Sequence, residues 1–481
     1  MTQAAMTQAA TIRAAINRAA MTRAAITRAA INRAAGPAVL CLAPGAAFGC
    51  ALPPSFILLM PTGLYIAAAA LTVALTALMG AFAHRLPAMT AKPVGERRVL
   101  LPVSVTSCIG FLGFVGLALI GLFGSTDPMH NLMTLVFWTG VWIAVPLGSM
   151  LIGNLWRPIN PWTGPVVITR TLIGWRGRLG LARLGYAPAC IGYAGFVWFQ
   201  MISLAPDDPR GLAVWALGYW AVIFGLAVAE GEDWLDRGEF LTVLFGMIAK
   251  ISPLWLQHSG SRVRLMRGWP GTQVLAMPPL SPSAIVFVTL ALAALTFDGL
   301  AQTFWWQGLI GENPLQPTGR SAVMVQNTAG LLAVWVLTLA AILGVIRLGR
   351  HVGGVAFSTG PMMLSFLAIA AGYHAAHNLV MLLTGGQYTL AALNDPLFRG
   401  DDWLGLPPFY VSFGFLSDPV TMPLIYGVQF AAILGAHLLA VLLALKLVGQ
   451  GARPLAHLPI TALMVGYTVL GLWLLSTARS G

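Results

Sequence analysis

The sequence has very little charge for its length. Only 9% of its 481 residues are charged, whereas 58% are hydrophobic. A soluble domain usually carries about 25% charged residues, so this chain cannot cover a water-facing surface of its own size. The deficit excludes an ordinary soluble enzyme and indicates that lipid covers much of the surface. We therefore judge the net charge of +12 by its position along the chain, and we expect no nucleic-acid partner.

Cysteine and the common catalytic motifs are scarce or absent as well. The four cysteines form no CxxC pair, which argues against a disulfide framework or a zinc knuckle. Cys108 and Cys190 lie in apolar runs and are expected to be buried thiols. The sequence contains no P-loop, no dinucleotide-binding glycine fingerprint, no GxSxG and no HExxH.

The N-terminal region differs from the rest of the chain. Residues 1–35 are seven five-residue units that end in Ala-Ala, and we interpret them as a low-complexity leader rather than a basic binding arm. Residues 36–49 are apolar and end in small residues after a basic stretch, which is the layout of a signal peptide. The expected membrane domain is 50–481.

The remaining chain predicts an all-α integral membrane protein with about ten transmembrane helices. A helix needs about 20 apolar residues to cross the hydrocarbon. The apolar runs that meet this requirement are 57–82, 103–124, 132–153, 185–206, 211–230, 284–303, 328–347, 357–385, 424–447 and 459–477.

Lys and Arg alternate between the connections of these spans. The connections 83–102, 154–184 and 231–283 are rich in Arg and Lys, and the connections between them hold one such residue at most. Cytoplasmic loops carry the excess of Lys and Arg, so both mature termini are predicted outside the cytoplasm. The expected location is a bacterial inner membrane.

Two connections are longer than a simple turn. We expect 231–283, which is amphipathic and rich in Trp, to lie along the inner membrane surface. The outer run LPPFYVSFGF at 406–415 is either a re-entrant cap over a cavity or a flexible lid. On the same outer side, Asp127 and His130 are expected to cap a helix rather than to bind a metal.

Four ionisable residues fall inside the predicted spans. Such groups are costly at bilayer depth, so each is a functional candidate. Asp298, His374 and His377 lie at the middle or outer half of their spans, and His437 lies near the middle of its own. His374 and His377 are three residues apart on one helix, which predicts that both rings share a face.

These four residues predict a single site. Three imidazoles and a carboxylate are suitable ligands for zinc, manganese or iron, so we expect Asp298, His374, His377 and His437 to bind a divalent metal. Alternatively, each histidine forms only a hydrogen bond to a neighbouring helix. The expected catalytic groups are Asp298, His377 and His437. The expected substrate contacts are Gln387, Gln429, Trp305 and Tyr373, and Gln429 is predicted to point the same way as His437.

Several runs resemble one family of bacterial multi-span proteins, which carries the name fenitrothion hydrolase. The similar runs are LTFDGLAQTFWW (295–306), FLAIAAGYHAAHNLVMLLTGGQ (366–387), the pair Asp395-Pro396, VQFAAILGAHLLAVLLA (428–444), AAFG (46–49) and NLWRPINPW (154–162). The likeness extends over most of residues 46–448. The leader of 1–35 departs from the family pattern.

The resemblance implies cleavage of an organophosphorus triester at the bond between phosphorus and the aryl oxygen. A metal-activated water would suit that reaction, and a small hydrophobic substrate could reach it from lipid. Two alternatives remain from the residues themselves. One is a transporter or metal-handling permease that uses the same His and Asp residues, and the other is a non-catalytic partner of a second membrane subunit.

Overall fold

The computed structural model describes residues 62–82, 85, 88–259, 262–316, 318–353, 359–406, 411–448 and 457–476. All of them belong to one compact unit, which spans Gly49–Gly481. The predicted leader and signal peptide lie outside the described residues, as do Cys41 and Cys50. Cys108 and Cys190 are half-buried free thiols.

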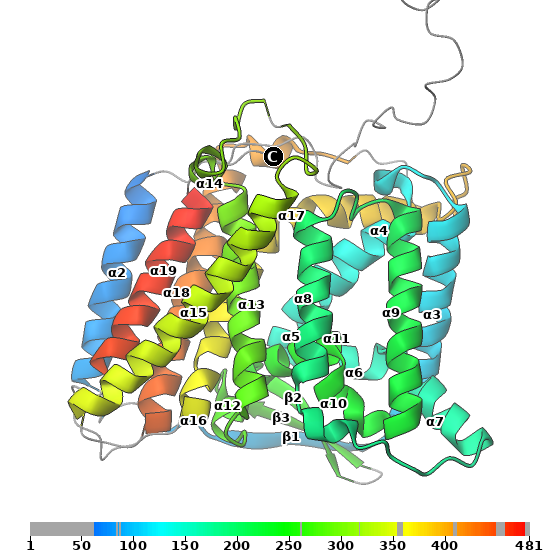
Figure 1. Cartoon of the computed structure of the whole chain (residues 1–481), viewed down its shortest axis with the longest axis horizontal. Helices are drawn as coiled ribbons and strands as arrows, with labels where there is room; N and C mark the ends of the chain where they lie inside the picture. The colour runs from blue at the N-terminus through cyan, green and yellow to red at the C-terminus, as the bar shows by residue number, and fades with distance from the viewer. Residues whose placement is uncertain are drawn as a thin grey trace, which may run out of the picture. The chain divides into compact units, whose positions relative to one another are not determined.

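The described chain is mostly helical, and each of the ten predicted spans coincides with a helix or a run of helices (Figure 1). The corresponding segments are α2 (Thr62–Ala81), α3 (Val103–Phe123), Leu132–Ile152, α8 (Ala187–Ile202), α9 (Pro209–Glu230), α13 (Pro282–Ala301), α15 (Met324–Gly353), α16 (Thr359–Leu364) with α17 (Phe366–Asn394), α18 (Thr421–Val448) and α19 (Leu458–Ser476). Within the described residues, eight of these helical segments are long and apolar enough to cross a membrane, whereas α2 and α8 have shorter apolar stretches. These eight support a multi-span membrane protein, and the number ten stays a prediction.

The run 132–152 is helical throughout but winds more loosely at its centre. It consists of α4 (Leu132–Leu135), a π-helix η3 (Val136–Ala144) and α5 (Val145–Ile152). Pro146 has no N–H, so the carbonyl of Trp142, four residues earlier, lacks its α-helical donor. π-Helical turns frequently occur at functional positions, and this one contacts α17.

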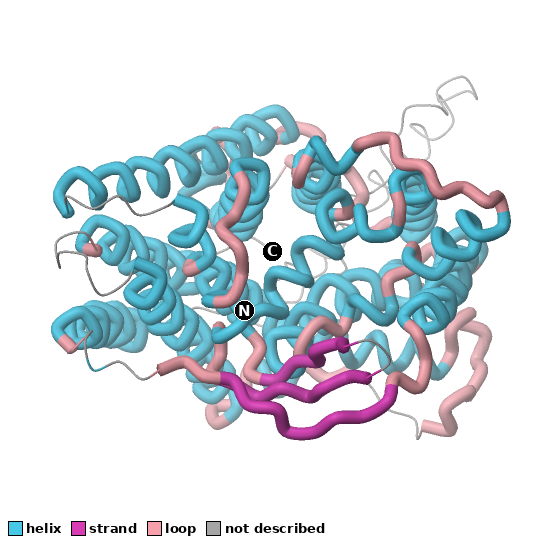
Figure 2. Tube along the Cα trace, turned by 90° about the horizontal axis from the view of Figure 1, so that it is seen from below, coloured by secondary structure: helices cyan, strands magenta, loops and turns pink. Residues whose placement is uncertain are grey.

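A small antiparallel sheet lies at one end of the helices, in segments that the sequence analysis treated as connections between spans (Figures 1 and 2). Its strands, in spatial order, are β1 (Ala91–Arg98), β3 (Arg262–Gly268) and β2 (Leu254–Ser259). The sequence analysis did not predict strands in 231–283, and its expectation that this connection lies along the inner membrane surface stays a prediction for this part. The runs LWLQHS and RVRLMRG present their side chains to alternate faces with a period of two, which suits strands.

The first part of 231–283 is placed differently from the prediction. It forms α10 (Leu235–Gly238) and α11 (Phe240–Ile248), and every residue of α11 except Gly246 is buried. Figure 1 shows α11 above the strands, where it contacts α5 and α8. This segment therefore enters the bundle instead of lying on its surface, because a helix that is apolar on all sides needs burial.

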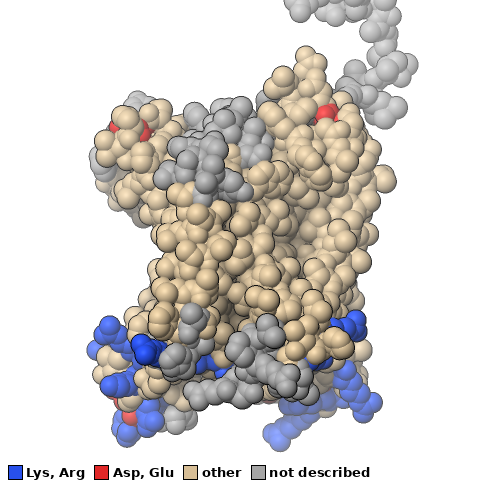
Figure 3. All heavy atoms as spheres, turned by 90° about the vertical axis from the view of Figure 1, so that its left-hand side faces the viewer, with Lys and Arg blue, Asp and Glu red and all other residues tan. Residues whose placement is uncertain are grey.

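Charged side chains are strongly segregated. Lys and Arg gather at the end that carries the sheet, and a broad band without charge separates them from the opposite end (Figure 3). This distribution agrees with the alternation of Lys and Arg in the sequence. The sheet end is therefore the end that the positive-inside rule assigns to the cytoplasm.

The described part of the outer segment rests on the bundle. Leu416, in the short helix η7 (Gly414–Leu416), belongs to an apolar cluster that also contains Leu379 and Val380 of α17. Gln387 of α17 exchanges hydrogen bonds with the backbone of Ser412 at 2.9 and 3.1 Å. The described residues of this segment therefore form a cap on α17 and α18, whereas 407–410 lie outside the described residues.

Candidate functional site

Asp298 and His377 meet inside the bundle. Asp298 belongs to α13 and His377 to α17, and the distance between Asp298 Oδ2 and His377 Nε2 is 2.9 Å. Their side chains are 19% and 7% exposed, respectively. Gln302, one turn further along α13, lies 3.4 Å from the other carboxylate oxygen through its Nε2. The sequence predicted this pair correctly from the depth of the two residues in their spans.

The ring of Tyr373 holds His377 from one side. Tyr373 lies four residues earlier on α17, and the two rings are stacked, with centroids 5.6 Å apart and planes inclined by 16°. Gly299 of α13 and Gly471 of α19 give the tyrosine its space, because a Cβ at either position would press against it. Tyr373 is thus a direct neighbour of His377, and its role as a substrate contact stays a prediction.

The second ring nitrogen of His377 is available. Nδ1 is buried and has no hydrogen-bond partner among the described residues. In a neutral ring the Nε2–H donates to Asp298, so Nδ1 carries the lone pair. A carboxylate that fixes the tautomer of a histidine in this way leaves the opposite nitrogen ready to accept a proton.

His374 points to a different neighbour, so the prediction that it shares a face with His377 was wrong. Its Nε2 donates to the carbonyl of Trp142 at 3.1 Å, and Asn378 Nδ2 lies 3.3 Å from its Nδ1. That carbonyl is the one that Pro146 leaves without an α-helical donor. A spacing of three residues turns the helix by about 300°, and the remaining 60° is enough to direct the two rings to different helices.

His437 lies apart from the pair as well. Its Nε2 is 2.6 Å from Thr76 Oγ1 of α2, and its Nδ1 is 2.8 Å from Thr468 Oγ1 of α19. Thr468 donates its own proton to the Met464 carbonyl at 2.9 Å. The Nδ1–H of His437 therefore donates to Thr468, and Nε2 accepts from Thr76. With both nitrogens engaged, His437 joins three helices.

The structure thus brings together two of the four predicted ligands. No group of three His, Cys, Asp or Glu side chains suitable for a metal occurs among the residues that the structure describes. The free Nδ1 of His377 offers a single nitrogen donor, which does not make a first coordination shell. Binding of zinc, manganese or iron stays a prediction, and we derive no reaction step through a metal.

The other predicted substrate contacts are dispersed. Gln429 donates to the Ala376 carbonyl at 2.8 Å and does not point with His437, because eight residues turn a helix by about 80° beyond two full turns. Gln387 holds the outer cap, as described above. Trp305 is 57% exposed at the start of α14 (Phe304–Leu309), as an interfacial tryptophan would be.

A narrow, mainly apolar cavity lies beside the Asp298–His377 pair. Tyr373 separates the two, since it lines the cavity and stacks on His377. Polar groups enter the cavity from Thr296, Tyr467 and Thr468. Mainly apolar walls with a few polar groups are typical of sites for small hydrophobic molecules.

Glu239 is a buried acid that the sequence analysis missed. Its side chain is completely buried between α10 and α11. It accepts hydrogen bonds from Tyr219 Oη at 2.8 Å, from the Leu241 N–H at 2.9 Å, and from both the N–H and the hydroxyl of Thr242 at 2.6 Å. Tyr219 lies at the middle of α9. The oxygens of Glu239 are occupied by donors, which suits a structural cap of α11.

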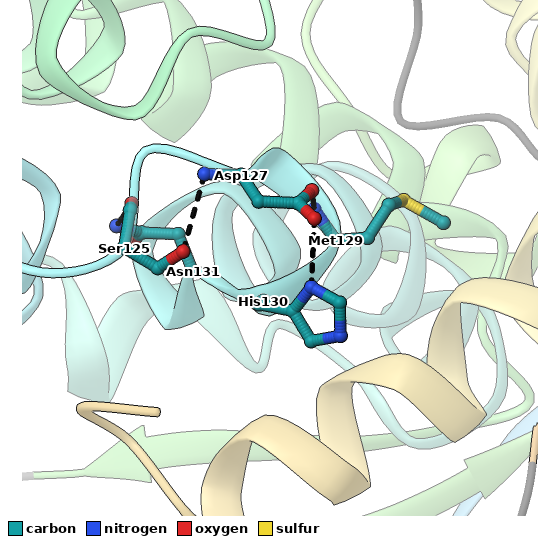
Figure 4. A network of polar contacts seen from close by, with 5 residues as sticks. All are labelled: Ser125, Asp127, Met129, His130 and Asn131. Carbon is teal, nitrogen blue, oxygen red and sulfur yellow. Dashed lines mark hydrogen bonds and ion pairs between the residues drawn. The ribbon is translucent and has the colours of Figure 1, made fainter. Parts of the chain in front are cut away.

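Asp127 and His130 form a small network on the outer side (Figure 4). Asp127 accepts from the Met129 N–H at 2.9 Å and lies 2.8 Å from His130 Nδ1. Asn131 accepts from the Met133 N–H and so caps α4. Asp127 is itself the N-cap of the short 3₁₀ helix η2 (Pro128–His130), so the prediction of helix capping is confirmed for Asp127, and His130 contacts that cap.

Comparisons of this chain with family models, curated proteins and solved structures found no match. The fold and the candidate site therefore rest on the residues and contacts described above.

Proposed function

We propose that the protein hydrolyses hydrophobic organophosphorus triesters from within the membrane, with His377 as general base and Asp298 as the group that orients it. The observation that supports this proposal is the buried, unpartnered Nδ1 of His377 beside a carboxylate-bound Nε2. The resemblance to the fenitrothion hydrolase family suggests the substrate class. The apolar cavity beside Tyr373 is suited to an aryl group entering from lipid.

The proposed reaction needs one proton acceptor. A water molecule attacks phosphorus while His377 Nδ1 takes its proton, and a new P–O bond forms. The bond between phosphorus and the aryl oxygen breaks, and the aryloxide leaves with the electron pair. Asp298 stabilises the imidazolium at 2.9 Å, and the proton returns to the aryloxide or to water.

The test is a hydrolysis assay on membranes that contain the full chain, with fenitrothion as substrate and release of the nitrophenol as readout. His377→Ala and Asp298→Asn should each lower the rate by about 100- to 10,000-fold, the usual contribution of a positioned general base. His437→Gln should lower the melting temperature and leave turnover per folded molecule unchanged, since His437 only joins helices.

Full activity in His377→Ala would refute the proposed base. Loss of activity on addition of a chelator would instead support the predicted metal. Folded wild-type protein without any hydrolysis would favour the transporter or the non-catalytic subunit.

We also propose ten crossings with both mature termini outside, in a bacterial inner membrane. Support comes from the coincidence of all ten predicted spans with helical segments, and from the gathering of Lys and Arg at one end. Helices α2 and α8 are the ones whose crossing this proposal adds to the eight long apolar segments.

A further inference from the structure

The three-stranded sheet has two chemically different faces. Residues paired across antiparallel strands point to the same side of a sheet. The pairing therefore groups Gly95 with Leu265 and Leu256 at the centre of one face. The same face carries Lys92, Arg97, Arg267, Val263, Leu254 and His258.

This face combines exposed leucines with unpaired cations. Leu256 is 55% exposed and Leu265 is 37% exposed, although they lie side by side. Lys92, Arg97 and Arg267 are exposed around them. No carboxylate lies on this face among the described strand residues, and no ion pair of these three cations is found there. We call it the cationic face.

The opposite face carries the ion pairs of the sheet together with half-buried apolar side chains. Glu96 lies there between two arginines, 3.1 Å from Arg264 Nε and 3.4 Å from Arg262 Nη1. Arg98 and Gln257 occupy the same side. Trp255 and Met266 lie on this face as well, and both are half-buried. Leu256 and Leu265 on the cationic face are adjacent and exposed, and they favour an apolar neighbour.

The sheet lies at the level where the helices end, on the side rich in Lys and Arg (Figures 1 and 3). Large apolar side chains flank it in sequence. Leu100 is 94% exposed just after β1, and Trp269 is 54% exposed just after β3. Exposed Trp and Leu beside cations are characteristic of segments that lie in the headgroup region of a bilayer.

We propose that the cationic face binds anionic phospholipid headgroups of the inner leaflet. Lys92, Arg97 and Arg267 contact the phosphates, and Leu256 and Leu265 enter the edge of the hydrocarbon. The leucines favour lipid over a nucleic acid, which has no apolar layer next to its phosphates. The experiment below includes an acidic peptide as a competing occupant. This site is independent of the hydrolase proposal.

The first experiment measures lipid retention by the full chain in nanodiscs of phosphatidylcholine with or without phosphatidylglycerol. Native mass spectrometry counts the lipids that stay bound after release. A triple variant, Lys92→Gln with Arg97→Gln and Arg267→Gln, removes the three cations of the cationic face. The matched control, Arg98→Gln with Arg262→Gln and Arg264→Gln, removes three from the same strands on the opposite face.

The triple variant should bind phosphatidylglycerol on the order of a hundredfold more weakly, about fivefold for each cation. The control should retain most of the wild-type affinity. Equal losses in both variants, or equal retention of both lipids by the wild type, would overturn the proposal. Displacement of phosphatidylglycerol by an RNA oligonucleotide or an acidic peptide at the same charge concentration would also overturn it.

A second experiment does not depend on the folding of the triple variants. Leu256→Cys and Gln257→Cys are made one at a time, with the native cysteines replaced by alanine, and each carries a fluorophore. A spin-labelled lipid should quench the fluorophore at 256 several-fold more than the one at 257, because consecutive strand residues face opposite sides. Equal quenching, or stronger quenching at 257, would show that the cationic face does not rest on lipid.

Discussion

His374, His377 and His437 lie at similar depth in their predicted spans. They differ in the hydrogen-bond partners of their ring nitrogens. Both ring nitrogens of His437 are engaged by neighbouring helices, and those of His374 are engaged by the Trp142 carbonyl and by Asn378 of its own helix, as buried polar atoms usually are. His377 alone of the three keeps a buried nitrogen without a partner. At the scale of the residue, the candidate for chemistry is therefore the histidine whose hydrogen bonding is incomplete.

His374 should stabilise the fold through the Trp142 carbonyl. His374→Ala leaves that carbonyl without its side-chain donor, at a cost of about 1–3 kcal/mol. Pro146→Ala in the same chain restores an N–H four residues after Trp142. The double variant should therefore regain part of the melting temperature lost by His374→Ala, measured on purified protein in detergent.

Pro146→Ala in the wild-type background is the control, and it should change the melting temperature less than it does beside His374→Ala. Equal effects in both backgrounds would mean that the histidine and the proline do not act on the same carbonyl.

At this scale the sequence predicted which residues matter better than it predicted where they point. Depth along the helix was sufficient to bring Asp298 and His377 together. The divergence of His374 was not predictable, because it depends on a π-helical turn and a proline in another span. Glu239 was overlooked because the acids around it in GEDWLDRGEF suggest a solvated segment.

Helices α17 and α18 approach each other closely at a glycine. A Cβ on Gly372 would lie 2.8 Å from the Ala432 carbonyl oxygen and would collide with the Ala436 methyl. Small residues at such seams allow helices in membranes to approach closely. This contact fixes the rotation of α17, which in turn directs His377 toward α13.

Gly372→Ala should therefore destabilise the protein by about 1–3 kcal/mol, because an added methyl has no space there. Gly386→Ala is the matched control on the same helix, since nothing lies within 4 Å of a Cβ at that position. The control should be neutral or should stabilise the protein by up to about 1 kcal/mol through better helix propensity. Thermal unfolding of both variants measures the difference, and similar shifts would contradict the close approach.

The start of α18 should depend on pH. Asp418 accepts hydrogen bonds from the Thr421 hydroxyl and N–H, both at 2.7 Å, and these bonds lower the pKa of its carboxyl. Because the folded-state pKa is depressed, the cap contributes stability above the unfolded value of about 3.9 and loses it as pH falls further.

The protection factors of the first-turn amides of α18, which correct exchange rates for the intrinsic effect of pH, should accordingly fall below about pH 4 in the wild type. Asp418→Asn should show the same protection factors at pH 6 and at pH 3. If Asp418→Asn retains the pH dependence, a group other than Asp418 causes it.

At the scale of the elements, apolar length predicted where most of the long helices lie, but α15 and α17 continue six and nine residues beyond their predicted ends at 347 and 385. The sheet was missed because its strands are short and lie in connections whose charge dominated the interpretation. The entry of α11 into the bundle was missed because its flanks are amphipathic, although FLTVLFGMI itself is apolar throughout.

For the molecule as a whole, the orientation and the crossing of α8 can be tested together. A reporter enzyme that is active only outside the cytoplasm is fused after Gly177 or after Pro206, on either side of α8. We expect inactivity at Gly177, within the Arg-rich connection, and activity at Pro206. Equal activity at both positions would mean that α8 does not cross the membrane. The reverse pattern would mean that the protein has the opposite orientation in the membrane.

The sheet also has a consequence for biosynthesis. Glu96 of β1 and its ion-pair partner Arg262 of β3 are 166 residues apart in the chain. At about 5–20 residues per second, β1 leaves the ribosome roughly 10–30 s before its partner strand exists. An unpaired strand edge is prone to aggregate, and Pro, Lys and Arg within a strand reduce that risk. The run AKPVGERR contains all three, so its composition should limit aggregation of β1 while the strand is unpaired, until β3 is made.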